Sequence, residues 1–145
     1  MDGLINFGGE IQKLNCENSL LKANSYISKY NLSITQAQAV SISEARSRAL
    51  KDAGRIELSP DIPAKILHAI CDSPYLTNDN IEDVLSSLTE AFYYYKNETL
   101  DIISDDEMIE FIGKNFSGKC QGSVEMLCSD CLEELRRRVT RKEFK

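Results

Sequence analysis

Three cysteines near the carboxyl end, Cys120, Cys128 and Cys131, have residue types and spacing that suit a metal ion. Thiolates and imidazoles are preferred ligands of tetrahedral Zn²⁺, so His68 and Cys71 could complete a four-ligand site. Against this, Cys128 and Cys131 lie on the apolar stripe of an expected helix, where free cysteine behaves as a small hydrophobe. No second Cys-x-x-Cys pair completes the set. A zinc site therefore remains an alternative, and no metal ligand is assigned.

Cys128 and Cys131 also form a Cys-x-x-Cys pair that could exchange with disulfides. Such chemistry is favoured by a low-pKa thiolate at a helix N-terminus after a strand, whereas Asp130 adds a negative charge beside the pair. The first ten residues have no basic residue and no long apolar stretch, so no secretory signal is expected. These features predict a cytoplasmic protein with free thiols, and Cys16 and Cys71 are expected in the core.

His68 is the only histidine, so a Ser-His-Asp or Cys-His catalytic group would have to use it. It lies off the face formed by Ile62, Ile66 and Ile70, which predicts a surface position. Asp72 follows one turn later and would make an ordinary i,i+4 contact. The sequence therefore offers no catalytic residue and no cofactor site, and it favours a protein that is not an enzyme.

Carboxylates gather around one expected helix start. They are Glu98, Asp101, Asp105, Asp106, Glu107 and Glu110. Carboxylates could hold Mg²⁺ or Ca²⁺, but no EF-hand loop is present. Ser104 and Glu107 form a capping-box pattern, and Asp105 and Asp106 occupy the first turn, where they favour the helix dipole. Helix capping thus accounts for the cluster, and metal binding is a second alternative.

The aromatic run from Phe92 to Tyr95 cannot face one way on a helix, since successive residues turn by about 100°. With Phe92 and Tyr95 pointing inward, Tyr93 and Tyr94 either cover other helices, which is favoured, or form an exposed patch. We hypothesise that such a patch, together with the acidic residues Asp105 and Asp106, forms a partner-binding surface.

Positive charge concentrates at the carboxyl end. It is carried by Arg136, Arg137, Arg138, Arg141, Lys142 and Lys145. Removing the last ten residues, 136–145, leaves 11 basic and 22 acidic residues, so the body has a charge of −11 against −6 for the whole chain. An acidic body repels nucleic acid and anionic lipid alike. The simpler interpretation of the basic tail is a solvated helix end. A regulator that binds nucleic acid through this tail is kept as an alternative.

The elements that must position these residues are predicted to be helices. The chain has 145 residues, 42% of them hydrophobic, with seven glycines and three prolines. Apolar periodicity and caps predict six helices, over about 9–30, 33–53, 59–73, 77–95, 104–116 and 124–139. Their expected end signals are Ser33 with Gln36, Gly54, Ser59 before Pro60, Thr77, and Ser104 with Glu107. Residues 55–58 are expected to be a loop.

The predicted fold class is therefore all-α, a single compact bundle of about six helices with short loops that forms one domain over residues 1–145. The longest apolar stretches run for only a few residues, so no membrane span is expected.

Several segments resemble an uncharacterised family of small proteins from anaerobic Gram-positive bacteria, catalogued as a domain of unknown function. The resemblance lies in CDSPYLT (71–77), FYYYKNETLDIISDDEMIEFI (92–112) and CQGS (120–123), and it extends through SEARSRALKDAGRIE (43–57). It implies a bacterial, cytoplasmic protein and brings no known activity, ligand or catalytic residue. The function hypothesis that assumes least is a non-enzymatic helical module that binds another protein or a second copy of itself.

Overall fold

The computed structural model describes the backbone of residues 2–141 and the side chains of residues 10–141. Six helices have nine or more residues within this part of the chain: α1 (Asp2–Lys22), α3 (Gln36–Ala53), α4 (Ile62–Ile70), α5 (Ile81–Glu98), α6 (Asp105–Ser117) and α8 (Leu132–Thr140). Shorter helical segments are α2 (Asn24–Ile27), a 3₁₀ turn (Ser28–Tyr30), α7 (Val124–Met126) and a π-helical turn (Leu127–Cys131). No strand occurs in residues 2–141, which confirms the all-α prediction.

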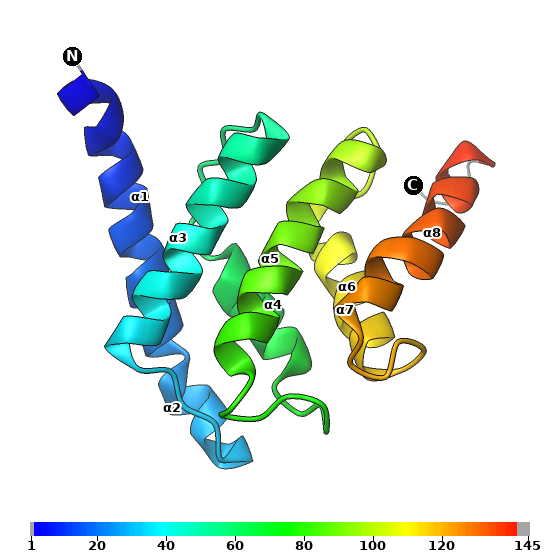
Figure 1. Ribbon diagram of the computed structural model, residues 1–145, viewed down its shortest axis with the longest axis horizontal. Helices are drawn as coiled ribbons and strands as arrows, with labels where there is room; N and C mark the ends of the chain where they lie inside the picture. The colour runs from blue at the N-terminus through cyan, green and yellow to red at the C-terminus, as the bar shows by residue number, and fades with distance from the viewer. Residues whose placement is uncertain (1, 142–145) are drawn as a thin grey trace.

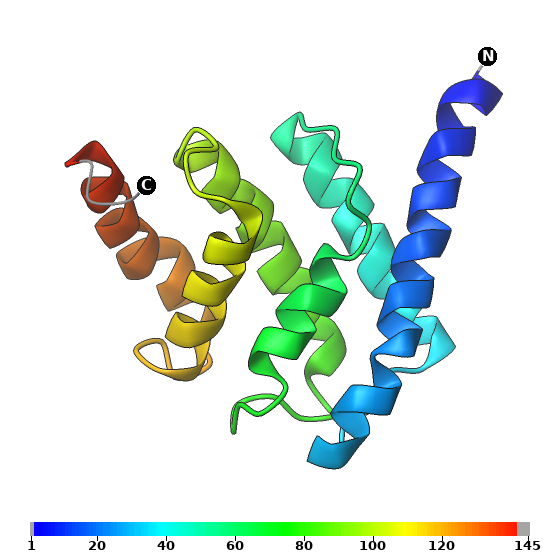
Figure 2. The same cartoon turned by 180° about the vertical axis from the view of Figure 1, so that it is seen from behind.

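The helices form two layers. Figure 1 shows α1, α3, α5 and α8 in one row, and Figure 2 shows α4 and α6 lying across the back of that row. From α3 onward the chain alternates between the layers, and the two termini lie near opposite ends of the long axis. Helix α5 packs against α3 on one side and against α4 and α6 behind it. It is therefore the central element of the bundle, and its buried face is wide.

Two end signals predicted from the sequence are confirmed. The Ser104 hydroxyl accepts a hydrogen bond from the Glu107 backbone N–H, and the Glu107 carboxylate accepts one from the Ser104 N–H, so the capping box of α6 is complete. Gly54 ends α3 in the left-handed conformation, with φ 67°. Each signal consists of neighbouring residues, and its geometry is local.

The predicted start of α3 is wrong by two residues. The capping box is formed by Thr35 and Gln38 in place of Ser33 and Gln36. The backbone N–H of Ser33 instead donates to the side-chain oxygen of Asn78, which lies before α5. A contact between segments distant in sequence therefore extends the chain at Ser33 and delays the helix.

The predicted starts of α4 and α5 are also wrong. Helix α4 begins after Asp61, and the carbonyl of the predicted cap, Ser59, accepts a hydrogen bond from Arg46. Helix α5 begins after Asn80, whose side chain accepts from the N–H of Thr77 and thereby closes a turn before the helix. In both cases the backbone of the residue predicted as a cap takes part in a contact ahead of the helix, and the helix begins later than predicted.

The first predicted helix, 9–30, is broken near Ala23 and ends in the 3₁₀ turn. Ile11, Leu14, Leu20 and Ile27 are apolar residues at helical spacing, but Ile11 and Leu14 are 45% and 54% exposed, whereas Leu20 and Ile27 are fully buried. Both views show α1 diverging from α3 toward the amino terminus. The core therefore contacts only the carboxyl half of this apolar stripe.

The final predicted helix, 124–139, is interrupted by the π-helical turn. The N–H of Leu132 donates to the carbonyl of Leu127, five residues earlier, and the hydroxyl of Tyr95 donates to the same carbonyl. A side chain that hydrogen-bonds into the backbone ladder is a recognised cause of such a distortion. We attribute the π turn to the hydroxyl of the buried Tyr95.

None of the helices within residues 2–141 is long and apolar enough to cross a membrane.

Candidate functional site

The candidate site is a groove of about 570 Å³ that follows α5 on the front of the bundle. Helices α3 and α5 form two of its walls, and α7 with the π turn forms the third. We call it the acidic groove; its lining residues are Ala49, Asp52, Ala53, Ser87, Glu90, Ala91, Tyr94, Asn97, Glu98, Val124 and Cys128. Three of these carry carboxylates and none is a lysine, arginine or histidine.

The groove combines a small apolar floor with a charged rim. Alanines from α3 and α5 contribute methyl groups to the floor, and Ala91 is 2% exposed. Asp52 and Glu90 are exposed, and Glu98 is half-buried at 3.3 Å from the guanidinium of Arg136. Small floor residues allow another backbone to approach closely, while the carboxylates create a negative potential along both edges.

The structure separates the two predicted tyrosines. Tyr94 is 47% exposed and lines the acidic groove, whereas Tyr93 is 1% exposed. The favoured interpretation, a tyrosine packed against other helices, therefore holds for Tyr93, and only Tyr94 fits the alternative of an exposed patch. Burial raises the pKa of Tyr93 to about 12, with the nearby Arg46 acting in the opposite direction.

Arg46 is a charged residue in the core that the sequence argument did not identify. It is 2% exposed, and its Nη2 donates to the side chain of Gln12 and to the carbonyls of Glu57 and Ser59. No carboxylate forms an ion pair with it in the part of the chain that the structure describes. Arg46 therefore connects the 55–60 loop to α3 through hydrogen bonds.

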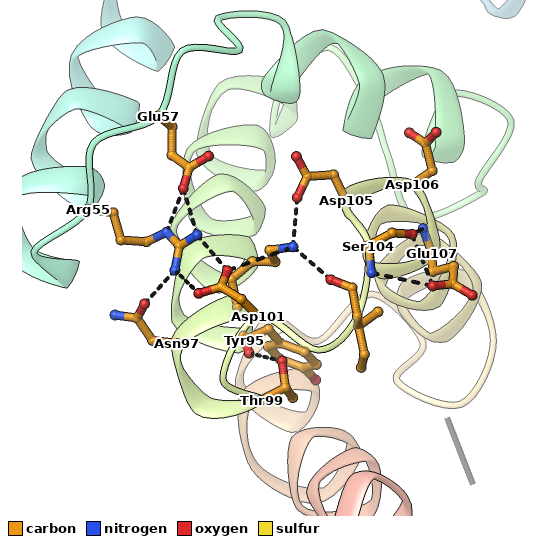
Figure 3. Close-up of polar contacts among 12 residues, drawn as sticks. Arg55, Glu57, Tyr95, Asn97, Thr99, Asp101, Ser104, Asp105, Asp106 and Glu107 are labelled. Atoms are coloured by element: carbon orange, nitrogen blue, oxygen red, sulfur yellow. Dashed lines mark hydrogen bonds and ion pairs between the residues drawn. The ribbon is translucent and has the colours of Figure 1, made fainter. Parts of the chain in front are cut away.

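Of the two acidic residues proposed for a partner surface, Asp105 belongs to an ion-pair network around the buried Lys96 (Figure 3). The ammonium of Lys96, 8% exposed, lies 2.8 Å from the Asp105 carboxylate and donates to the carbonyl of Ile103 at 2.7 Å. Asp106 is 86% exposed and lies 3.7 Å from the ammonium of Lys65. Asp105 thus fixes the start of α6, while Asp106 remains at the surface and away from the acidic groove.

Arg55 forms the other half of the network (Figure 3). Its guanidinium contacts both oxygens of Asp101, at 2.7 and 3.1 Å, as well as Glu57 and Asn97. The contact holds a strained turn, since Leu100 and Asp101 both adopt left-handed φ values, 56° and 57°. Hydrogen bonding to Asp101 raises the pKa of Arg55, and the same contact lowers the pKa of Asp101.

The lowered pKa of Asp101 predicts a stability difference that depends on pH. We expect Asp101→Asn to reduce the unfolding free energy by about 1 kcal/mol at neutral pH, a modest value because the side chain is 54% exposed. Because the pKa of Asp101 is lower in the folded than in the unfolded protein, its charge stabilises the fold at pH values above the unfolded pKa of about 3.9. That stabilisation is lost as the pH falls through the folded pKa. Urea unfolding at about pH 7 and about pH 2.5 measures the change.

As the pH falls and the Asp101 carboxyl takes up its proton, the unfolding free energies of the two proteins should move toward each other. Asp106→Asn is the matched control, since this exposed carboxylate lies 3.7 Å from its partner. It should change stability by less than about 0.5 kcal/mol at either pH. A difference for Asp101→Asn that persists unchanged at low pH would contradict the role of the charge.

The structure brings together two of the five residues considered as candidate zinc ligands. The sulfurs of Cys120 and Cys131 are 3.2 Å apart, whereas Cys128 lines the acidic groove. His68 is exposed, as predicted, and its ring packs against Tyr26 at 4.6 Å between centroids. Within the described residues no group of three or more His, Cys, Asp or Glu side chains could hold a metal ion. The four-ligand zinc arrangement considered as an alternative is therefore not formed by the described residues.

The basic tail is partly used by the fold. Arg136 contacts Glu98 at 3.3 Å and Glu133 at 3.4 Å. Arg137 and Arg138 contribute to lowering the pKa of Glu134, after its larger contact with Lys119. Lys142 and Lys145 lie outside the described residues.

The chain belongs to a family of unknown function (DUF6323), whose pattern matches residues 19–145. This match confirms the predicted membership in a family without an assigned activity. Comparison with curated proteins and with solved structures gives no match. The geometry of the acidic groove is therefore the basis for any functional assignment.

Proposed function

We propose that this protein is a binding module whose acidic groove accepts a basic amphipathic helix of a partner protein. The observation that carries the proposal is the lining itself: an apolar floor between carboxylates, with no cation among the lining residues. A helix with apolar side chains on one face and lysines or arginines beside them matches both features.

The size and shape of the groove fit this kind of partner. Its volume of about 570 Å³ is in the range of sites that accept a few side chains, such as the i, i+3 and i+4 anchors of one helix. The floor methyl groups of Ala49, Ala53 and Ala91 leave room for those anchors. Tyr94 stands at the side of the groove with an exposed ring, a residue type that often contributes strongly to binding energy.

The charges supply orientation and selectivity. Asp52 on α3 faces the groove from one wall and Glu90 lines it from α5, while Glu98 on the same helix is already paired with Arg136. Cations on both edges of a bound helix would therefore meet carboxylates, and an acidic helix would be repelled. The described residues offer no comparable support for the metal-binding or nucleic-acid alternatives. A bacterial origin, a cytoplasmic location and a single domain remain predictions.

A designed peptide pair tests the proposal directly. The probe is an amphipathic helical peptide of about 16 residues with leucines at i, i+3, i+4 and i+7 and lysines on its flanks; the control replaces every lysine with glutamate. We expect the lysine peptide to bind in fluorescence anisotropy, more weakly as salt rises, and the glutamate peptide not to bind.

Variants locate the binding to the groove. Tyr94→Ala should weaken binding of the lysine peptide by about tenfold or more. Glu90→Lys should weaken its binding further, because it reverses a charge at the rim of the groove. Tyr30→Ala is the matched control, because Tyr30 is 37% exposed and lies outside the groove. Equal binding of the two peptides, or full binding by Tyr94→Ala, would exclude the acidic groove as the binding surface.

A further inference from the structure

Two buried thiols outside the proposed binding surface lie in direct contact. The sulfurs of Cys120 and Cys131 are 3.2 Å apart, and the two residues are 2% and 1% exposed. Cys120 belongs to the turn between α6 and α7, and Cys131 ends the π-helical turn. The two positions are 11 residues apart in the sequence. Neither residue lines the acidic groove.

The backbone around Cys120 aims its sulfur inward. The N–H of Cys120 donates to the carbonyl of Asn115 at 2.8 Å, and its own carbonyl accepts from Ser123 at 2.9 Å. Gln121 and Gly122 turn the chain with left-handed φ values of 50° and 86°. Cys120 is thereby held in a tight turn whose neighbours on both sides, Lys119 and Gln121, are exposed.

Cys131 is positioned from the other side. Its sulfur lies 3.7 Å from the side-chain oxygen of Asn115, the same residue whose carbonyl holds Cys120. The π turn that ends at Cys131 is stabilised by the hydroxyl of Tyr95. A disulfide requires a sulfur separation of about 2.05 Å, so closing the bond needs a movement of only about 1.2 Å shared between two side chains.

We propose that Cys120 and Cys131 form a reversible dithiol–disulfide site that a low-molecular-weight disulfide, such as glutathione disulfide, oxidises. Because Lys119 and Gln121 on either side of Cys120 are exposed, a local opening of this surface turn is enough to bring the oxidant to the pair. The sulfurs are already in contact, so the second step is intramolecular and favoured over a lasting mixed disulfide.

The reaction balances as two thiol–disulfide exchanges. One cysteine loses its proton, and the thiolate attacks one sulfur of glutathione disulfide, which releases a glutathione thiolate and leaves a mixed disulfide. The second cysteine loses its proton and attacks the protein sulfur of that mixed disulfide, which releases the second glutathione. The protein loses two electrons and two protons, and glutathione disulfide becomes two glutathione thiols.

The third carboxyl-terminal cysteine is an internal control. Cys128 is half-buried on the acidic groove side, and within the described residues no sulfur lies within hydrogen-bonding distance of it. Sequence spacing alone would pair Cys128 with Cys131, since they form the Cys-x-x-Cys motif. The structure instead selects Cys120 as the partner of Cys131.

The test uses the full chain, fully reduced and then treated with excess glutathione disulfide. After acid quenching and alkylation, mass spectrometry of the intact protein should show the loss of two hydrogen atoms. Digestion without reduction should link the Cys120 and Cys131 peptides and leave Cys128 alkylated or carrying glutathione. Dithiothreitol should restore both thiols, and the oxidised protein should have a Tm at least about 4 °C higher than the reduced protein.

Substitutions distinguish this pair from other pairings. Cys128→Ser should retain the mass loss, whereas Cys120→Ser and Cys131→Ser should each abolish it. The peptide map of the unmodified sequence decides the result even where a serine variant folds poorly. A Cys128–Cys131 link, glutathione adducts that persist on Cys120 or Cys131, or complete alkylation of both thiols would each overturn the proposal. None of these results depends on the peptide-binding experiments.

Discussion

Replacing Arg46 with alanine is expected to lower the unfolding free energy by about 3–4 kcal/mol, the largest effect of any charged residue in the bundle. The side chain is 2% exposed and donates from Nη2 to the carbonyls of Glu57 and Ser59. Alanine leaves those carbonyls without their partner and creates a cavity between α1, α3 and the 55–60 loop. Urea unfolding followed by circular dichroism gives the difference directly.

Two further variants separate the causes. Arg46→Met keeps most of the apolar volume and removes a buried charge that has no carboxylate partner, so we expect about half the loss seen with alanine. Arg48→Ala is the control on the same helix, since Arg48 is exposed, and it should change stability by less than about 0.5 kcal/mol. A near-neutral Arg46→Ala would show that the loop is held without this side chain.

Arg46 also shows where sequence reasoning fails on this fold. The helical spacing of Ile42, Ala45 and Ala49 puts them on one face of α3, and all three are buried. A charged residue beside that face is normally exposed. Arg46 is buried because a loop distant in sequence supplies backbone acceptors for it, and no local pattern encodes that loop's path.

The same reason explains the outcome for the aromatic run on α5. Periodicity placed Phe92 and Tyr95 inward, and both are buried. Tyr93 is buried as well, because α5 is the central helix and has neighbours on several sides. A single stripe predicts one packed face, whereas a central helix has a wider one. Of the four residues, Tyr94 alone is exposed, and it lines the acidic groove.

The candidate site was therefore predictable only in part. Helical geometry left Tyr93 and Tyr94 off the main stripe but favoured both as covers for other helices, so it did not single out Tyr94. Asp52 and Val124 could not be predicted as lining residues, because they come from other segments and the position of those segments depends on tertiary packing. The acidic cluster and its capping role were visible in the sequence, but its ion pairs were not, because the pairing of Asp101 with Arg55 and of Asp105 with Lys96 depends on how separate segments pack.

Lys96 gives the second large prediction. We expect Lys96→Ala to lower the unfolding free energy by about 3 kcal/mol, because it removes a buried ammonium that joins α5 to the start of α6. The carbonyl of Ile103 then loses its donor at 2.7 Å and the Asp105 carboxylate loses its cation at 2.8 Å. The strained turn at Leu100 and Asp101 also loses one of its supports.

The exposed counterpart on α4 provides the matched comparison. Lys65 lies 3.7 Å from Asp106, the next carboxylate of the same helix start, and its side chain is 46% exposed. Lys65→Ala should cost less than about 0.5 kcal/mol, so the two lysines isolate the effect of burial at the same helix terminus. In a double-mutant cycle, Asp105→Asn should change stability less in the Lys96→Ala background than in the wild type. Additive effects would mean that Lys96 acts through the Ile103 carbonyl alone, and the carboxylate would then contribute only to the helix dipole.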